Sequence, residues 1–96
     1  MIWDIEHGRL MSIDEIVYHY LSDDGFKRVE IHGVTSSFEI KNIKSIDLGY
    51  ENEFFMIKIN NNITLRICVD DMDDYFDTGI SFQLTLRNGE FFIFYY

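Results

Sequence analysis

The residues best suited to chemistry in this sequence are the aspartates of the stretch VDDMDDYFDTG, residues 69–79. Clustered carboxylate oxygens are the ligands that hard cations such as Ca²⁺ prefer. The spacing does not fit the calcium loop of an EF-hand. Counted from Asp71, the glycine required at position 6 would be Phe76, and counted from Asp70, the ligand at position 3 would be Met72. We therefore predict no metal site here.

The same run has a second interpretation as a protein-contact loop between two strands. Tyr75 and Phe76 lie among the carboxylates, and this mixture suits docking on a basic surface, where aromatic side chains are buried and aspartates steer and pair with Arg or Lys. The alternative is a solvated loop whose charges keep neighbouring strand edges from associating. The candidate partner-binding residues are Asp70, Asp71, Asp73, Asp74, Tyr75, Phe76 and Asp77.

The remaining reactive residues form no recognisable catalytic or ligand pattern. His7, His19, His32 and Cys68 are not at zinc-ligand spacing from one another. Nothing in the sequence around Cys68 marks it as a reactive nucleophile. Neither a glycine-rich phosphate loop nor a Gly-x-Ser-x-Gly elbow is present. We predict no catalytic residue, no metal and no cofactor, and we predict that the protein is not an enzyme.

The charge balance points to a basic protein partner. The 96 residues carry 17 acidic against 8 basic side chains, a net charge of −9. Such a surface repels nucleic-acid phosphates and anionic lipid, so direct binding to nucleic acid or to a membrane is disfavoured. The basic residues are scattered and form no basic stripe. An acidic surface can also simply keep a protein in solution.

Length and cysteine content predict a single domain, residues 1–96, in the cytoplasm. The one cysteine, Cys68, excludes an internal disulfide and suggests a reducing compartment. The first residues carry Asp4 and Glu6 where a signal peptide needs an apolar run. No stretch approaches the roughly 18–20 apolar residues of a membrane-spanning helix.

One amphipathic helix is predicted from residue 13 to about residue 23. Ser12 and Glu15 have the spacing of a capping box. Gly25 suits a left-handed helix stop. A short strand over residues 2–5 is one interpretation of the ambiguous segment before it. One buried stripe follows from the apolar residues Ile13, Ile16, Val17, Tyr20 and Leu21.

After Gly25 the apolar period changes from 3.6 to 2, which predicts strands. Short connections rich in asparagine and glycine separate them, so the strands must pair in antiparallel fashion. The predicted fold class is α+β, with one short N-terminal helix packed on an antiparallel meander sheet of about five to seven strands. The alternating segments are 28–32, 38–40, 46–50, 55–59, 63–69 and 80–86.

The last strand, in the stretch EFFIFYY, is apolar on both faces. A two-residue type I′ turn at Asn88-Gly89 predicts that Leu84 lies opposite Ile93. On that register the second face of the last strand carries Phe92, Phe94 and Tyr96. Either the chain covers this face itself, or the face is the self-association surface of a homodimer.

No single motif decides the function, so the functional prediction rests on the class of protein. The sequence suits a small acidic inhibitor, of the immunity or counter-defence type, whose carboxylates occlude a basic site on a nucleic-acid-handling partner. The alternative is a structural or assembly module that forms a homodimer through the C-terminal aromatic strand. A small-molecule site between the helix and the sheet is a third possibility, and it would need polar groups that converge inside an apolar cavity.

Overall fold

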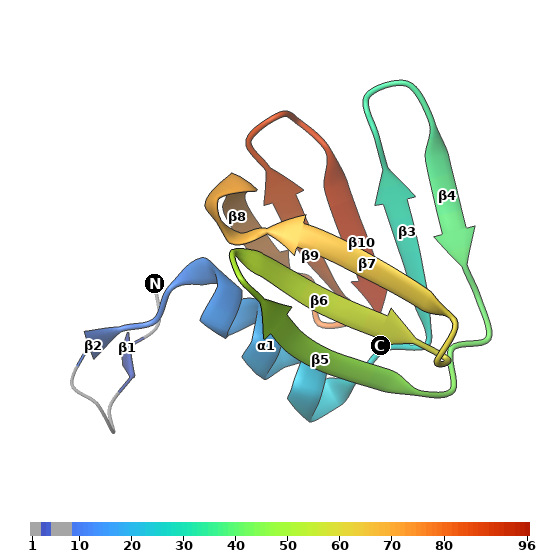
Figure 1. Cartoon of the computed structure of the whole chain (residues 1–96), viewed down its shortest axis with the longest axis horizontal. Helices are drawn as coiled ribbons and strands as arrows, with labels where there is room; N and C mark the ends of the chain where they lie inside the picture. The colour runs from blue at the N-terminus through green and yellow to red at the C-terminus, as the bar shows by residue number, and fades with distance from the viewer. Residues whose placement is uncertain (1–2, 5–8) are drawn as a thin grey trace.

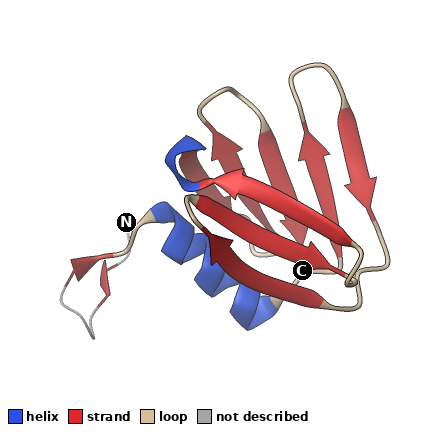
Figure 2. Cartoon of the chain, in the orientation of Figure 1, coloured by secondary structure: helices blue, strands red, loops and turns tan. Residues whose placement is uncertain are grey.

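The computed structural model of the chain describes residues 3–4 and 9–96 (Figures 1 and 2). The predicted α+β class, the N-terminal helix and the antiparallel pairing are confirmed in these residues. The elements are β1 (Trp3–Asp4), β2 (Arg9–Leu10), α1 (Ile13–Asp24), β3 (Arg28–His32), β4 (Ser37–Ile40), β5 (Ile46–Glu51), β6 (Phe54–Ile59), β7 (Ile63–Cys68), the 3₁₀ turn η1 (Val69–Asp71), β8 (Met72–Asp77), β9 (Ser81–Leu86) and β10 (Phe91–Tyr95).

The strands after α1 form two sheets rather than one meander. The larger sheet has the order β4-β3-β10-β9-β8, and the smaller has the order β5-β6-β7. β10 therefore lies between β3 and β9, at the centre of the larger sheet. Figure 1 shows α1 and the three-stranded sheet on the same side of the five-stranded sheet, and side chains from all three meet in one core.

The helix α1 begins and ends at the predicted residues. The Ser12 amide donates to Glu15 Oε1 at 3.4 Å, and the Ser12 hydroxyl lies 2.7 Å from the same oxygen. Gly25 ends the helix with φ +66°, and its amide donates to the Leu21 carbonyl at 3.0 Å. Within the predicted apolar stripe, Ile16, Val17 and Leu21 are fully buried. No helix of residues 3–4 and 9–96 is long and apolar enough to cross a membrane.

The core lies between the two layers. Burying a large apolar side chain contributes roughly 1.5–3 kcal/mol, so these contacts are the main source of stability. Phe26 and Phe94 pack edge to face at a centroid distance of 4.9 Å, which joins the segment after α1 to β10. The buried apolar strand residues are Val29, Met72, Phe82, Leu84, Phe92 and Phe94 from the larger sheet, and Phe55, Ile57, Ile59 and Ile67 from the smaller.

The register of β9 and β10 differs from the prediction by one residue. The Leu86 amide donates to the Glu90 carbonyl at 2.8 Å, so the loop has three residues, 87–89, rather than two. Gly89 takes the left-handed position of this loop at φ +93°. Leu84 consequently lies opposite Phe92 and not opposite Ile93. A shift of one residue turns every side chain of β10 to the other face of the sheet.

The predicted turn at residues 60–62 is confirmed. Asn60 and Asn61 have φ angles of +52° and +59°, as a type I′ turn requires, and the Asn62 amide donates to the Ile59 carbonyl at 3.1 Å. The Asn60 side-chain oxygen also accepts from the amides of Lys44 at 2.7 Å and Ser45 at 3.1 Å. This side chain therefore fixes the β4–β5 connection against the β6–β7 turn.

Candidate interaction surface

The acidic run was predicted to be a loop. In the structure it is a short 3₁₀ turn followed by an edge strand. Residues Val69–Asp71 form η1, and β8 pairs with β9 at the end of the five-stranded sheet. Aspartate has a low preference for strands, which is why composition alone suggested a loop. Hydrogen bonding to β9 overrides this preference, with Asp74 opposite Thr85 and Asp77 opposite Phe82.

The two aromatic residues of the run have different environments. Tyr75 packs over Phe82 with ring centroids 6.0 Å apart, so its ring belongs to the edge of the core. Phe76 points to the opposite face, beside Gln83, and its side chain is 63% exposed. Of the two predicted anchors, only Phe76 presents an exposed ring.

The carboxylates of the run lie on the surface, and two of them accept hydrogen bonds from nearby backbone amides. Asp74 Oδ1 accepts from the Tyr75 amide at 2.8 Å, and Asp77 Oδ1 accepts from the Gly79 amide at 2.8 Å. Asp70, Asp71, Asp73, Asp74 and Asp77 are all exposed. We call the exposed residues Asp70, Asp71, Asp73, Asp74, Phe76 and Asp77 the acidic edge.

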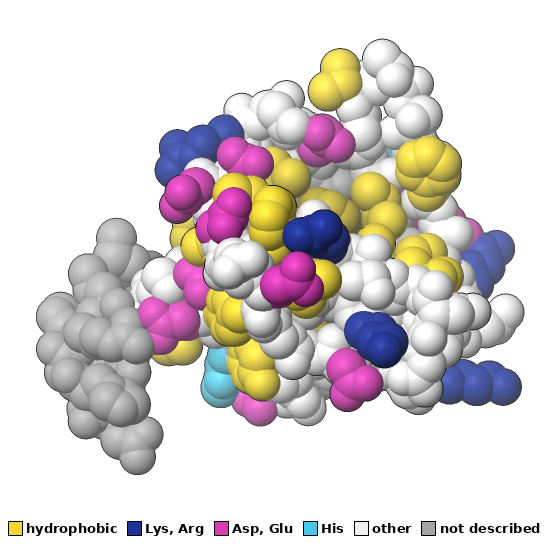
Figure 3. Space-filling view, in the orientation of Figure 1, with side chains coloured by type: hydrophobic (Ala, Val, Ile, Leu, Met, Phe, Trp, Pro, Cys, Tyr) yellow, Lys and Arg dark blue, Asp and Glu magenta, His cyan; other side chains and the backbone are white. Residues whose placement is uncertain are grey.

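One cation, Arg87, contacts the acidic edge among the ion pairs of the described residues. Its Nη1 lies 3.9 Å from Asp73 Oδ1, and its Nε donates to the Asp70 carbonyl at 2.8 Å. Figure 3 shows acidic side chains, in magenta, gathered over the region where η1 and β8 lie in Figure 1. This part of the surface therefore carries an excess of negative charge.

A groove of about 550 Å³ lies between β8 and the start of α1. Sequence reasoning missed it because its two walls are some 60 residues apart in the chain, and no local pattern links them. One wall combines apolar side chains with the helix cap, and the other is the acidic strand. The lining residues are Met11, Ser12, Ile13 and Ile16 on one side, and Asp73, Asp74, Tyr75, Phe76 and Asp77 on the other.

The residues predicted for self-association, Phe92, Phe94 and Tyr96, do not form an exposed stripe. Phe94 is fully buried and Phe92 is 9% exposed, because the register places both on the core face of β10. Tyr96 is partly buried against the same core. The expectation that these three side chains face away from the core is therefore wrong.

The outer face of β10 carries Phe91, Ile93 and Tyr95 instead, all half-buried. The His32 ring stacks on Phe91 at 4.5 Å and 10°, and the Arg28 guanidinium lies 3.8 Å above the Tyr95 ring. Side chains of β3 thus cover part of this aromatic face.

The polar groups of β3 that flank this face are paired. His32 Nε2 lies 2.9 Å from Glu30 Oε1, and Arg28 Nη1 lies 2.9 Å from Glu39 Oε2. The hydrogen bond with His32 lowers the pKa of the Glu30 carboxyl, and Arg28 acts in the same direction. Glu30 therefore stays charged to a lower pH than an ordinary glutamate.

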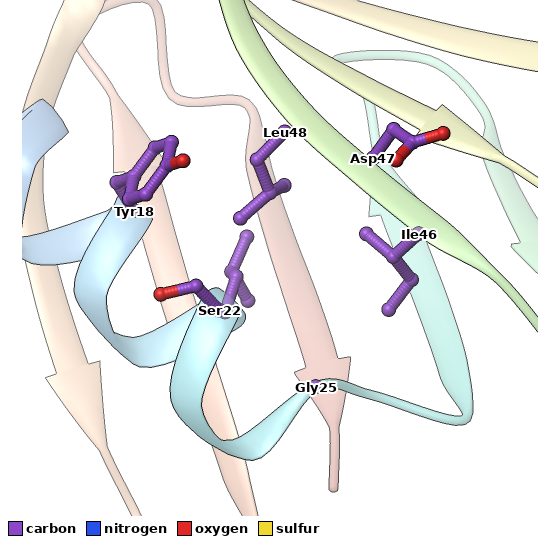
Figure 4. Close-up of a pocket in the computed structure, with 7 residues that line it drawn as sticks. Tyr18, Ser22, Gly25, Ile46, Asp47 and Leu48 are labelled. Carbon is purple, nitrogen blue, oxygen red and sulfur yellow. The ribbon is translucent and has the colours of Figure 1, made fainter.

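A second, smaller pocket of about 380 Å³ lies between α1 and β5 (Figure 4). Its walls include Tyr18, Leu21, Ile46 and Leu48. Its polar side chains do not converge, because Figure 4 shows the oxygen atoms of Ser22 and Asp47 pointing in different directions. The pocket thus has the predicted place of a small-molecule site without the converging polar groups that such a site needs.

The β5 side of this region also holds a tyrosine–carboxylate pair. The Tyr50 hydroxyl donates to Asp14 Oδ2 at 2.7 Å. Partial burial, followed by this hydrogen bond and the Asp14 charge, raises the pKa of Tyr50 well above that of a free tyrosine. The pair fastens the first turn of α1 to β5.

Within residues 3–4 and 9–96, no group of three His, Cys, Asp or Glu side chains could hold a metal ion. His7 lies outside the described residues. Comparison of the chain with protein-family models, with curated proteins and with solved structures found no match. The acidic edge and the groove beside it are the two features of the surface that suggest a function.

Proposed function

We propose that this protein is a cytoplasmic inhibitor that binds a basic surface on a nucleic-acid-handling partner through its acidic edge. The observation that carries the proposal is the position of the acidic edge on an open sheet edge, where Phe76 is 63% exposed. The carboxylates occupy the place that nucleic-acid phosphates take on the partner. Carboxylates and phosphates pair with Arg and Lys in the same way.

The opposite edge of the same sheet is electrostatically balanced. On β4, Glu39 lies 2.9 Å from Arg28 and 3.2 Å from Lys41. At the acidic edge, by contrast, Arg87 is the one cation that pairs among the residues that the structure describes. The acidic edge therefore has a local excess of negative charge, which can steer a basic partner to β8.

The homodimer alternative rested on an exposed stripe of Phe92, Phe94 and Tyr96. The burial of Phe92 and Phe94 removes the support for that surface. For this reason the acidic edge, rather than the C-terminal strand, is the contact surface in our proposal.

The test measures whether the protein displaces DNA from a panel of purified basic DNA-binding enzymes. The edge variant D73N/D74N/D77N removes three negative charges from β8. Its matched control, D23N/D47N/E53Q, removes three charges from exposed positions elsewhere. We expect the wild-type protein and the control to displace DNA from at least one enzyme, and the edge variant to need about tenfold more protein.

The association rate should also fall steeply as salt is added, since long-range steering is screened over a Debye length of about 10 Å at 0.1 M. If the edge variant and the control weaken DNA displacement equally, net charge alone, and not the acidic edge, determines binding to the enzyme. Failure of the wild-type protein to displace DNA from every enzyme in the panel would contradict the inhibitor proposal.

A further inference from the structure

We infer that the groove beside β8 accepts an extended basic segment of the partner, which pairs with the free edge of β8 as an added strand. The inference rests on the proposed function in taking β8 as the contact surface. It goes further because it names the conformation and the chemistry of the segment that binds.

Among the strands of residues 3–4 and 9–96, β8 pairs with β9 alone, so one side of its backbone is unpaired there. The Thr78 amide donates to the Ser81 carbonyl at 2.9 Å. Hydrogen-bonded positions alternate along an antiparallel pair. Asp74 and Phe76 therefore direct their amides and carbonyls to β9, and Tyr75 and Asp77 direct theirs outward.

The outward-facing amide of Tyr75 has a side-chain acceptor where a neighbouring strand would supply a carbonyl. It donates to the side chain of Asp74 at 2.8 Å, so a neighbouring carboxylate serves in place of a strand partner. A segment that approaches from the groove can offer a carbonyl instead. Strand addition of this kind gains affinity from main-chain hydrogen bonds and specificity from the alternating side chains.

The groove has room and an apolar wall for such a segment. Its volume of about 550 Å³ lies within the range of roughly 300–1,000 Å³ that is typical of ligand pockets. The partly exposed side chains of Met11 and Ile13 face β8 across it. Alternate side chains of an extended segment could pack on this wall, and the other side chains would meet carboxylates.

Charge complementarity selects a basic segment. Asp73, Asp74 and Asp77 line the groove, so lysine or arginine side chains of the segment would meet carboxylates of opposite sign. A second copy of β8 would bring like charges together, which is destabilising between paired strands. The bulge between Met72 and Asp74 limits the pairing to the short stretch from Asp74 to Asp77. Charged side chains and a bulge commonly protect an edge strand from pairing with other chains. A basic segment would neutralise the charge of these side chains.

The experiment uses a labelled peptide of four Lys-Val repeats as the probe. A second peptide has the same sequence with alternate backbone nitrogens methylated, so that its charge is kept and strand pairing is blocked. We expect the first peptide to bind the wild-type protein and D23N/D47N/E53Q alike. Backbone methylation and D73N/D74N/D77N should each weaken binding by about tenfold or more. On binding, hydrogen exchange at the Tyr75 and Asp77 amides should slow.

The outcomes separate this inference from the proposed function. Equal binding of the methylated peptide would overturn strand addition, and so would unchanged exchange at Tyr75 and Asp77. Absence of peptide binding by a protein that still displaces DNA from a basic enzyme would overturn this inference alone. If the protein neither binds the peptide nor displaces DNA from any enzyme of the panel, the proposed function is overturned as well.

Discussion

Two phenylalanines of the five-stranded sheet show how the surroundings of a side chain decide its contribution to stability. Phe94 is fully buried, and Phe76 is 63% exposed. Phe94→Ala should lower the free energy of unfolding by about 3–5 kcal/mol, since it removes buried surface and leaves a cavity. Phe76→Ala should change the free energy of unfolding by no more than about 0.5 kcal/mol. Urea unfolding followed by circular dichroism measures both, and similar losses for the two variants would contradict the observed register.

The Glu30–His32 pair predicts a pH dependence. The folded-state pKa of Glu30 is lowered from the ordinary value of 4.5, first of all by its hydrogen bond with His32. A lowered folded pKa contributes stability above the unfolded pKa, and this contribution is lost as the pH falls through the folded value. Glu30→Gln should therefore flatten the loss of stability below about pH 4.5. Urea midpoints between about pH 3 and 6 give the comparison, and parallel curves for the two proteins would argue against the pair.

At the scale of elements, the β9–β10 loop depends on the backbone freedom of one glycine. Gly89 has φ +93°, and an added Cβ would meet no atom within 4 Å. Gly89→Ala should therefore cost about 1–2 kcal/mol through backbone strain alone. Gly49 in β5 also has open space but needs no positive φ, so Gly49→Ala should be neutral or slightly stabilising. Thermal unfolding of both variants tests the three-residue loop, and a harmless Gly89→Ala would contradict it.

The helix and the turn at residues 60–62 could be predicted from the sequence because their signals are local. Ser12, Glu15 and Gly25 act within a few residues of the helix ends. The register of β10 could not be predicted in this way. Asn88-Gly89 suits a two-residue loop as well as a three-residue loop, and the alternation within FFIFY gives no face preference. The face is decided by packing of Phe94 against Phe26, a contact between distant segments.

The same limit applies to the candidate site. The acidic residues could be named from sequence, but their strand conformation depends on pairing with β9. The groove needs Met11, Ile13 and Ile16 to lie opposite β8. Nothing in the pattern around either segment specifies that approach, because it follows from how α1 packs on the sheet.

At the scale of the whole molecule, the distribution of apolar surface predicts a monomer. Phe92 and Phe94 of the C-terminal strand are buried in the chain's own core, and the net charge of −9 opposes association of like molecules. Light scattering should give a mass of 11.5 kDa at both low and moderate salt. A mass of twice that value would favour the homodimer alternative, through a surface other than the predicted one.

The central place of β10 has a consequence for how the protein is made. β3 and β9 each pair with β10 and not with each other, and β3 is separated from β10 by almost the whole length of the chain after α1. The hairpins of the smaller sheet can form while the chain is still being synthesised. The larger sheet cannot close until Tyr95 has left the ribosome. Until then Val29 and Phe82 lack Phe94, which lies between them in the finished sheet. The nascent chain therefore exposes apolar surface of the kind that chaperones bind.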